Sequence, residues 1–147
     1  LLAGYMKKLG PMTLARFPRR IINIHPALLP KFGGQGMYGR FVHEAVLAAK
    51  ERVTGVTVHI VDEHYDHGPV VDQSAVEVLE SDTVESLGAR VLAREHEFLV
   101  ETLNKIATGA IDLDRITGLT APTTGAIGIG EDVLGPLAGE SRPEVRG

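Results

Sequence analysis

Residues 20–25 read Arg-Ile-Ile-Asn-Ile-His, and residues 56–61 read Val-Thr-Val-His-Ile-Val. Both are short runs rich in β-branched residues, which is typical of β-strands. The first run stops at Pro26, which is followed closely by Pro30, and the second leads into a polar loop. Since aromatic residues make up only 5% of the chain, aliphatic runs such as these must supply most of the core.

Helical patterns flank these two strands. Residues 40–50 place apolar side chains at the spacing of a helix. Residues 70–78 are a candidate strand pair, and Asp82-Thr83-Val84-Glu85 resembles a capping box that opens a helix to about residue 107. Residues 1–6 are largely apolar and predict a buried strand. Strands that alternate with helices indicate an α/β layered fold.

The 147 residues suit about one domain, followed by a tail of different character. We expect a folded part over residues 1–115 and a Gly/Pro-rich, irregular extension over residues 116–147. The chain opens inside an apolar run at Leu1 rather than at a Met. We therefore expect it to be the back part of a longer protein.

Charge is divided unevenly along the chain, although the net charge is only −4. Residues 1–43 hold seven Lys or Arg and no carboxylate, and the first acidic residue is Glu44. A basic front half suggests an anionic small ligand or a nucleic acid, unless a preceding segment supplies balancing acids. The chain has no Cys, which excludes a disulfide framework and a Cys nucleophile, and no apolar run approaches the ~20 residues of a membrane span.

Asn23 and His25 are the first candidate functional pair. Alternation along a strand places both side chains on one face, at the end of the strand where open α/β sheets bind ligands. An amide NH₂ beside an imidazolium makes two donors for a developing oxyanion, with a proton source. The alternative is that both side chains merely satisfy backbone groups of the following loop.

The loop after residue 61 carries the second candidate group. Asp66 is placed to approach His25 and, as an anion, to raise the pKa of that imidazole, as a general acid requires. Asp62 and Asp66 are equally compatible with ordinary turn residues. His59, His64 and His67 with Asp62 suggest a metal, but their spacing matches no compact metal motif, so we expect no metal.

Two further features stand apart from these groups. Residues 34–39 match G-x-G-x-x-G and precede a helix, but two prolines separate them from the strand, so we do not expect a dinucleotide site. Glu95 falls on the apolar side of its predicted helix, where a carboxylate is costly unless it is paired. It either faces the hydroxyls of a ligand or pairs with Arg94 or another cation.

Three blocks in order resemble the phosphoribosylglycinamide formyltransferases, also called glycinamide ribonucleotide transformylases, with the N-terminal part missing. They are L-A-G-Y-M at 2–6, N-I-H-P-A-L-L-P at 23–30 and V-T-V-H-I-V-D-E-H-Y-D-H-G-P-V at 56–70. Pro26, where the related deformylases usually carry a second His, favours a transferase. The chain departs from the family at His67, in the glycine-rich run 33–39 and in lacking the phosphate-binding glycine loop.

The resemblance implies a fold and a set of roles. The fold is the C-terminal part of a formyltransferase-type Rossmann-like open sheet, mixed parallel and antiparallel, with flanking helices. His25 corresponds to the general acid, Asn23 to the donor that holds the formyl oxygen and Asp66 to the carboxylate partner. The implied folate-site residues are Met6, Lys7, Lys8, Leu9, Asn23, Asp62 and Tyr65, and the implied substrate contacts are Glu95 and Pro26.

The implied reaction moves a formyl group from 10-formyltetrahydrofolate to the amine of glycinamide ribonucleotide, in de novo purine biosynthesis. The alternatives are another 10-formyltetrahydrofolate-dependent transferase, acting on a sugar nucleotide or methionyl-tRNA, and a non-catalytic folate- or nucleotide-binding fragment. We expect a cytoplasmic protein with no metal, nucleic-acid or membrane partner. The 147 residues alone are expected to be poorly active.

Overall fold

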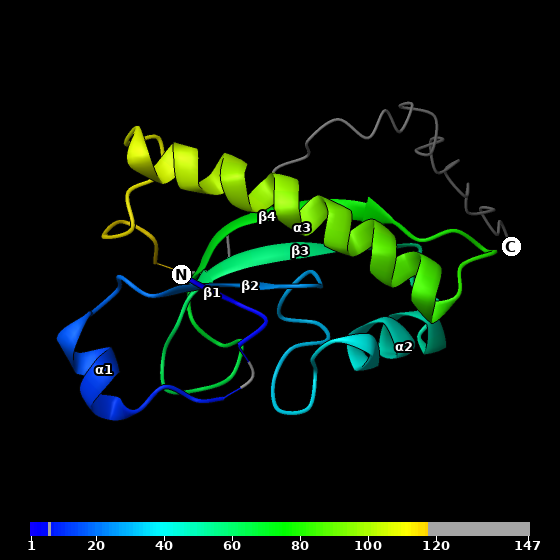
Figure 1. The fold of residues 1–147 in the computed structure, drawn as a ribbon, viewed down its shortest axis with the longest axis horizontal. Coiled ribbons are helices and arrows are strands. Elements are labelled where there is room, and N and C mark those ends of the chain that lie inside the picture. The colour runs from blue at the N-terminus through cyan, green and yellow to red at the C-terminus, as the bar shows by residue number, and fades with distance from the viewer. Residues whose placement is uncertain (6, 118–147) are drawn as a thin grey trace, which may run out of the picture.

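The computed structural model describes residues 1–5 and 7–117, and these residues form one open four-stranded sheet with helices packed beside it (Figure 1). The sheet order is β1 (Leu2–Ala3), β2 (Ile22–His25), β3 (Val53–Ile60) and β4 (Val70–Glu77). β1 pairs with β2 in parallel, and the other two pairings are antiparallel. The predicted mixed α/β sheet is thus confirmed.

In the described residues three helices accompany the sheet: α1 (Pro11–Arg16), α2 (Arg40–Ala48) and α3 (Val84–Ala107). α3 packs along β3 and β4 and also contacts α2 (Figure 1). No helix in the described part of the chain combines the length and apolar character needed to cross a membrane. The core lies between the sheet and α3 and consists of Ile22, Ile24, Val46, Val56, Val58, Ile60, Val71, Val76, Leu87, Val91 and Phe98.

The sequence predictions for the elements hold in type and differ in detail. The expected strand pair at 70–78 is a single strand, β4, whose partner is β3. The capping box of α3 begins one residue later than predicted: Thr83 caps the helix and exchanges hydrogen bonds with Ser86. Asp82 instead binds the guanidinium of Arg90, which holds the pKa of that carboxyl well below its usual range.

The predicted buried strand at 1–6 is wrong in length and burial. β1 covers only Leu2–Ala3, and Ala3 and Tyr5 are exposed. Within residues 1–5 and 7–117, β1 is an edge strand with β2 as its one partner, so its other edge is unpaired.

The last described residues fold back onto the sheet. Ile111, Leu113 and Ile116 pack against the core, and the Arg19 guanidinium donates to the carbonyl oxygens of Leu113 and Ile116. The start of the predicted extension at residue 116 is therefore attached to the folded part. Residues 118–147, the rest of that extension, lie outside the described residues.

Candidate active site

The site begins where β2 pairs with β3. Asn23 lies opposite His59 and His25 lies opposite Thr57, so these four side chains share one face of the antiparallel pair. The Asn23 amide Nδ2 is 3.2 Å from His59 Nε2. His59 Nδ1–H donates to the carbonyl oxygen of Ile60 at 3.1 Å, which leaves Nε2 as the acceptor of the amide hydrogen.

Thr57 fixes the turn that follows His25. Its buried hydroxyl donates to the carbonyl oxygen of Ala27 at 2.7 Å and accepts from the backbone N–H of Leu29 at 3.1 Å. Gln73 on β4 donates to the same hydroxyl at 2.9 Å. A polar network thus anchors residues 27–29 to the sheet and holds the turn after β2 in place.

Asp66 stands beside both histidines. Its Oδ1 lies 3.4 Å from His25 Nδ1 and 3.5 Å from His59 Nε2, and its Oδ2 accepts from the backbone N–H of Gly34 at 3.0 Å. The Asp66 backbone is left-handed, with φ of 49°. Asp is one of the few residues that tolerate this conformation, so both the backbone and the chemistry favour Asp here.

The protonation of His25 differs from the sequence prediction. The ring is 3% exposed, and its Nε2–H donates to the carbonyl oxygen of Phe32 at 2.7 Å. Burial lowers the pKa of His25, and the Asp66 charge and the Phe32 carbonyl oppose that effect without overcoming it. The predicted net upward shift is therefore wrong, because desolvation of the imidazolium is the larger effect.

The pKa of Asp66 is below its usual value. Burial raises it, but the neighbouring His59 ring, the His25 charge and the Gly34 N–H together outweigh burial. The carboxylate therefore stays ionised beside His25 at neutral pH. An ionised Asp66 is the form that offsets part of the cost of protonating His25.

A cavity of about 900 Å³ opens in front of this group. Its wall includes six residues that the sequence singles out, namely Asn23, His25, Pro26, Tyr65, Asp66 and Glu95. Lys8 lies close by, with its Nζ 5.2 Å from the centre of the Tyr65 ring. Lys7, Leu9 and Asp62 do not line the cavity, and Met6 lies outside the described residues.

Glu95 on α3 is half-buried in the cavity wall, and burial raises its pKa to about 7. The alternative partner, Arg94, binds Glu97 and Glu101 instead. Among the described residues no cation forms an ion pair with the Glu95 carboxylate. It is therefore available to a ligand in the cavity.

Three contributors were not identified from the sequence. His59 was grouped with a possible metal set, yet it lies 2% exposed between Asn23 and Asp66. His43 on α2 is buried in the cavity wall, and its Nδ1 has no hydrogen-bond partner in the described part of the chain. The glycine-rich loop 34–39 also lines the cavity. Only the β2–β3 register identifies His59, and that register is not local in sequence.

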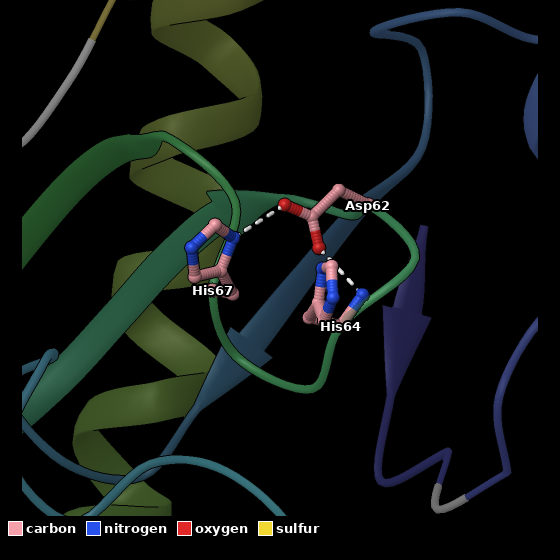
Figure 2. A group of neighbouring side chains, drawn as sticks. All are labelled: Asp62, His64 and His67. Atoms are coloured by element: carbon pink, nitrogen blue, oxygen red, sulfur yellow. Dashed lines mark hydrogen bonds and ion pairs between the residues drawn. The ribbon is translucent and has the colours of Figure 1, made fainter.

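The remaining histidines of the polar loop form a separate cluster. Asp62, His64 and His67 each offer one ligand atom, and these three atoms lie within 4.8 Å of one another (Figure 2). The set of four suggested by the sequence is therefore wrong in one member, because the buried His59 contacts Asn23 and Asp66 instead.

Comparison with known proteins identifies the family to which the chain belongs. The family model described as formyl transferase matches residues 1–103. The chain is 52% identical over 106 residues to the chloroplastic phosphoribosylglycinamide formyltransferase of Arabidopsis thaliana, and 41% identical over 128 residues to the phosphoribosylglycinamide formyltransferase of Mycobacterium tuberculosis. These alignments cover 72% and 87% of this chain.

A solved structure gives the same result. The phosphoribosylglycinamide formyltransferase from Bacillus halodurans superposes with a TM-score of 0.65 and 43% identity, over 73% of this chain. The chain spans 36% of the Arabidopsis protein, 56% of the mycobacterial protein and 53% of the Bacillus chain. Since the family model matches well over half of the residues, the chain belongs to the formyl transferase family.

Proposed function

We propose that this chain carries the catalytic centre of a transferase that moves a formyl group from 10-formyltetrahydrofolate to the amine of glycinamide ribonucleotide, as in de novo purine biosynthesis. The observation that supports it most directly is the convergence of Asn23, His25 and Asp66 on one cavity. The names of the similar proteins support the choice of acceptor.

The residues suit an acyl transfer in which the substrate amine is itself the nucleophile. The amine forms a bond to the formyl carbon, and negative charge develops on the formyl oxygen. Asn23 offers the amide hydrogen that His59 does not use, and protonated His25 would offer a second donor by turning its Nε2–H from the carbonyl oxygen of Phe32 to the formyl oxygen. Donors preorganised at this oxygen are the largest contribution in this class of reaction.

Proton balance completes the step. The bond between the formyl carbon and the folate nitrogen breaks, the attacking amine loses a proton, and the folate nitrogen gains one. His25 is the proton carrier in this proposal, and Asp66 favours its protonated form. Because burial lowers the pKa of His25, the protonated ring is a stronger acid than a free imidazolium and gives up its proton more readily.

The other binding roles are proposals of the same kind. Glu95 and Pro26 line the cavity and suit contacts to the nucleotide, where the half-buried carboxylate would accept from ribose hydroxyls. Lys7, Lys8, Leu9, Asp62 and Tyr65, with Met6, are proposed for the folate side; Tyr65 and its neighbour Lys8 offer an aromatic face and a cation. A cytoplasmic location also remains a prediction.

The test measures formyl transfer with the natural protein that contains this chain. We expect His25→Ala and Asn23→Ala each to lower kcat by at least about 100-fold, the usual cost of one lost oxyanion donor. Asp66→Asn is expected to act similarly, while Asp114→Asn, an exposed carboxylate bound to Arg20 and outside the cavity wall, keeps parental turnover. Near-parental activity in His25→Ala would contradict the assignment.

A panel of acceptors separates the alternatives within the family. Glycinamide ribonucleotide should be formylated with a much higher kcat/KM than a sugar nucleotide or methionyl-tRNA. Preference for either of the latter would keep the catalytic roles and replace the acceptor. Binding of a folate analogue without any turnover would favour a non-catalytic binding protein.

A further inference from the structure

The polar loop between β3 and β4 carries a second group of ligating side chains. Asp62 Oδ2 is 2.7 Å from His67 Nδ1, and Asp62 Oδ1 accepts from the backbone N–H of His64 at 2.8 Å (Figure 2). The rings of His64 and His67 stand 5.2 Å apart, centre to centre. Three side chains thus converge within one short turn.

The distances suit a shared ion. One ligand atom from each residue lies within 4.8 Å of the other two, so small side-chain rotations bring all three to bonding distance of one centre. Asp62 accepts a hydrogen bond from the turn itself, and the side chains of His64 and His67 both lie beside its carboxylate (Figure 2).

The turn that carries them is tightly fixed. A Cβ at Gly68 would stand 1.8 Å from the carbonyl oxygen of Ile60, so the chain at this point is pressed against the end of β3. The two ends of the loop are also joined by a hydrogen bond, which the backbone N–H of Ile60 donates to the carbonyl oxygen of Pro69 at 2.8 Å. A fixed turn reduces the conformational entropy lost when its side chains bind an ion.

The donor set selects the class of ion. Two imidazole nitrogens and one carboxylate oxygen suit Zn²⁺, Ni²⁺ or Cu²⁺, whereas Mg²⁺ and Ca²⁺ prefer all-oxygen sites. The side chains of His64 and His67 are 62% and 70% exposed, so an ion can enter from solvent and keep water in its remaining positions. We propose that Asp62, His64 and His67 form a binding site for a borderline divalent cation of this class.

This site is distinct from the proposed catalytic group. His25 and Asp66 lie together in the cavity wall, with His59 buried beside Asp66, whereas the three ligands lie outside the cavity wall. Asp66 lies between His64 and His67 in the sequence, so a bound ion would restrain the loop that carries it. Asp62, also proposed for the folate side, is the one residue that both proposals use, and the cation site does not depend on the proposed reaction.

The experiment is metal binding to the natural protein, measured with ZnCl₂ by equilibrium dialysis, with Co²⁺ absorption as a second probe. We expect one equivalent of Zn²⁺ per chain. His64→Ala and His67→Ala should each weaken binding by at least about tenfold, because loss of even an outer-shell partner of a metal ligand costs that much. His96→Ala is the matched control, since His96 lies on α3 outside the loop.

Unfolding should not account for a loss of binding in these variants, because the side chains of His64 and His67 are exposed. Both variants should keep the parental circular dichroism spectrum. His25→Ala should also keep the Zn²⁺ affinity. Absence of saturable binding would overturn the proposal. Binding that His25→Ala abolishes but His64→Ala leaves intact would overturn it too, because the ion would then belong to the cavity.

Discussion

Glu95→Gln tests whether burial in the cavity wall makes the ionised Glu95 carboxylate destabilising. Burial raises the pKa of Glu95 from 4.5 to about 7 in the folded chain. Between these two values the folded state holds a proton that the unfolded state has released, so the free energy of unfolding falls as the pH rises through this window. Gln has no charge to desolvate, so the variant should lack this loss.

The magnitude follows from the two pKa values. Their difference sets a ceiling of about 3 kcal/mol once the carboxyl is ionised in both states. The side chain is only half-buried, so water screens part of the penalty, and we expect about 1 kcal/mol. Glu95→Gln should therefore be more stable than the parent by that amount at pH 8 and by much less at pH 5.

Urea unfolding followed by circular dichroism at pH 5 and pH 8 provides the measurement. Glu97→Gln is the matched control: the side chain lies two residues away on α3 and is 72% exposed. It should show no gain at pH 8. If Glu95→Gln destabilised the chain equally at both pH values, the carboxylate would be serving as a structural acceptor, and the reasoning from desolvation would be refuted.

Three other outcomes are expected. Gly68→Ala should destabilise the fold by more than about 2 kcal/mol, because its Cβ would overlap the Ile60 carbonyl oxygen, and a urea midpoint equal to the parent's would contradict this. Thr57→Val should cost about 1–3 kcal/mol in thermal or urea unfolding, because buried backbone groups lose their partner; Thr57→Ser, which keeps the hydroxyl, should lose less. The parent should lose stability on acidification below pH 6.5, because His25 has a lowered pKa when folded and the unfolded chain therefore binds the proton more readily. His25→Gln should reduce that loss; an unchanged dependence of stability on pH would show that the ring is not desolvated.

The elements with strong local patterns were predictable from the sequence. β2, α2 and α3 follow from apolar periodicity, and α3 is misplaced only at its cap, where Thr83 rather than Asp82 begins the helix. β3 starts at Val53, before the predicted strand, because Gly55 weakens the local signal while pairing with β4 extends the strand. Pairing between distant segments overrides local preference here.

The candidate site was predictable only in part, because some of its geometry is local in sequence and some is not. Asn23 and His25 share a face by strand alternation, which is local. The position of His59 depends on the β2–β3 register, which joins segments 36 residues apart, and the burial that lowers the pKa of His25 depends on the whole sheet. Neither can be inferred from a motif.

The left-handed backbone at Asp66 has a consequence for how this position can change by mutation. Asn and Gly also accept that conformation at low cost, and each is one nucleotide away from an Asp codon. A library randomised at residue 66 and sorted only for folding should therefore retain Asp, Asn and Gly. Sorting for the proposed reaction should retain Asp alone, so a lineage could lose catalysis here by a single base change and still produce a folded protein.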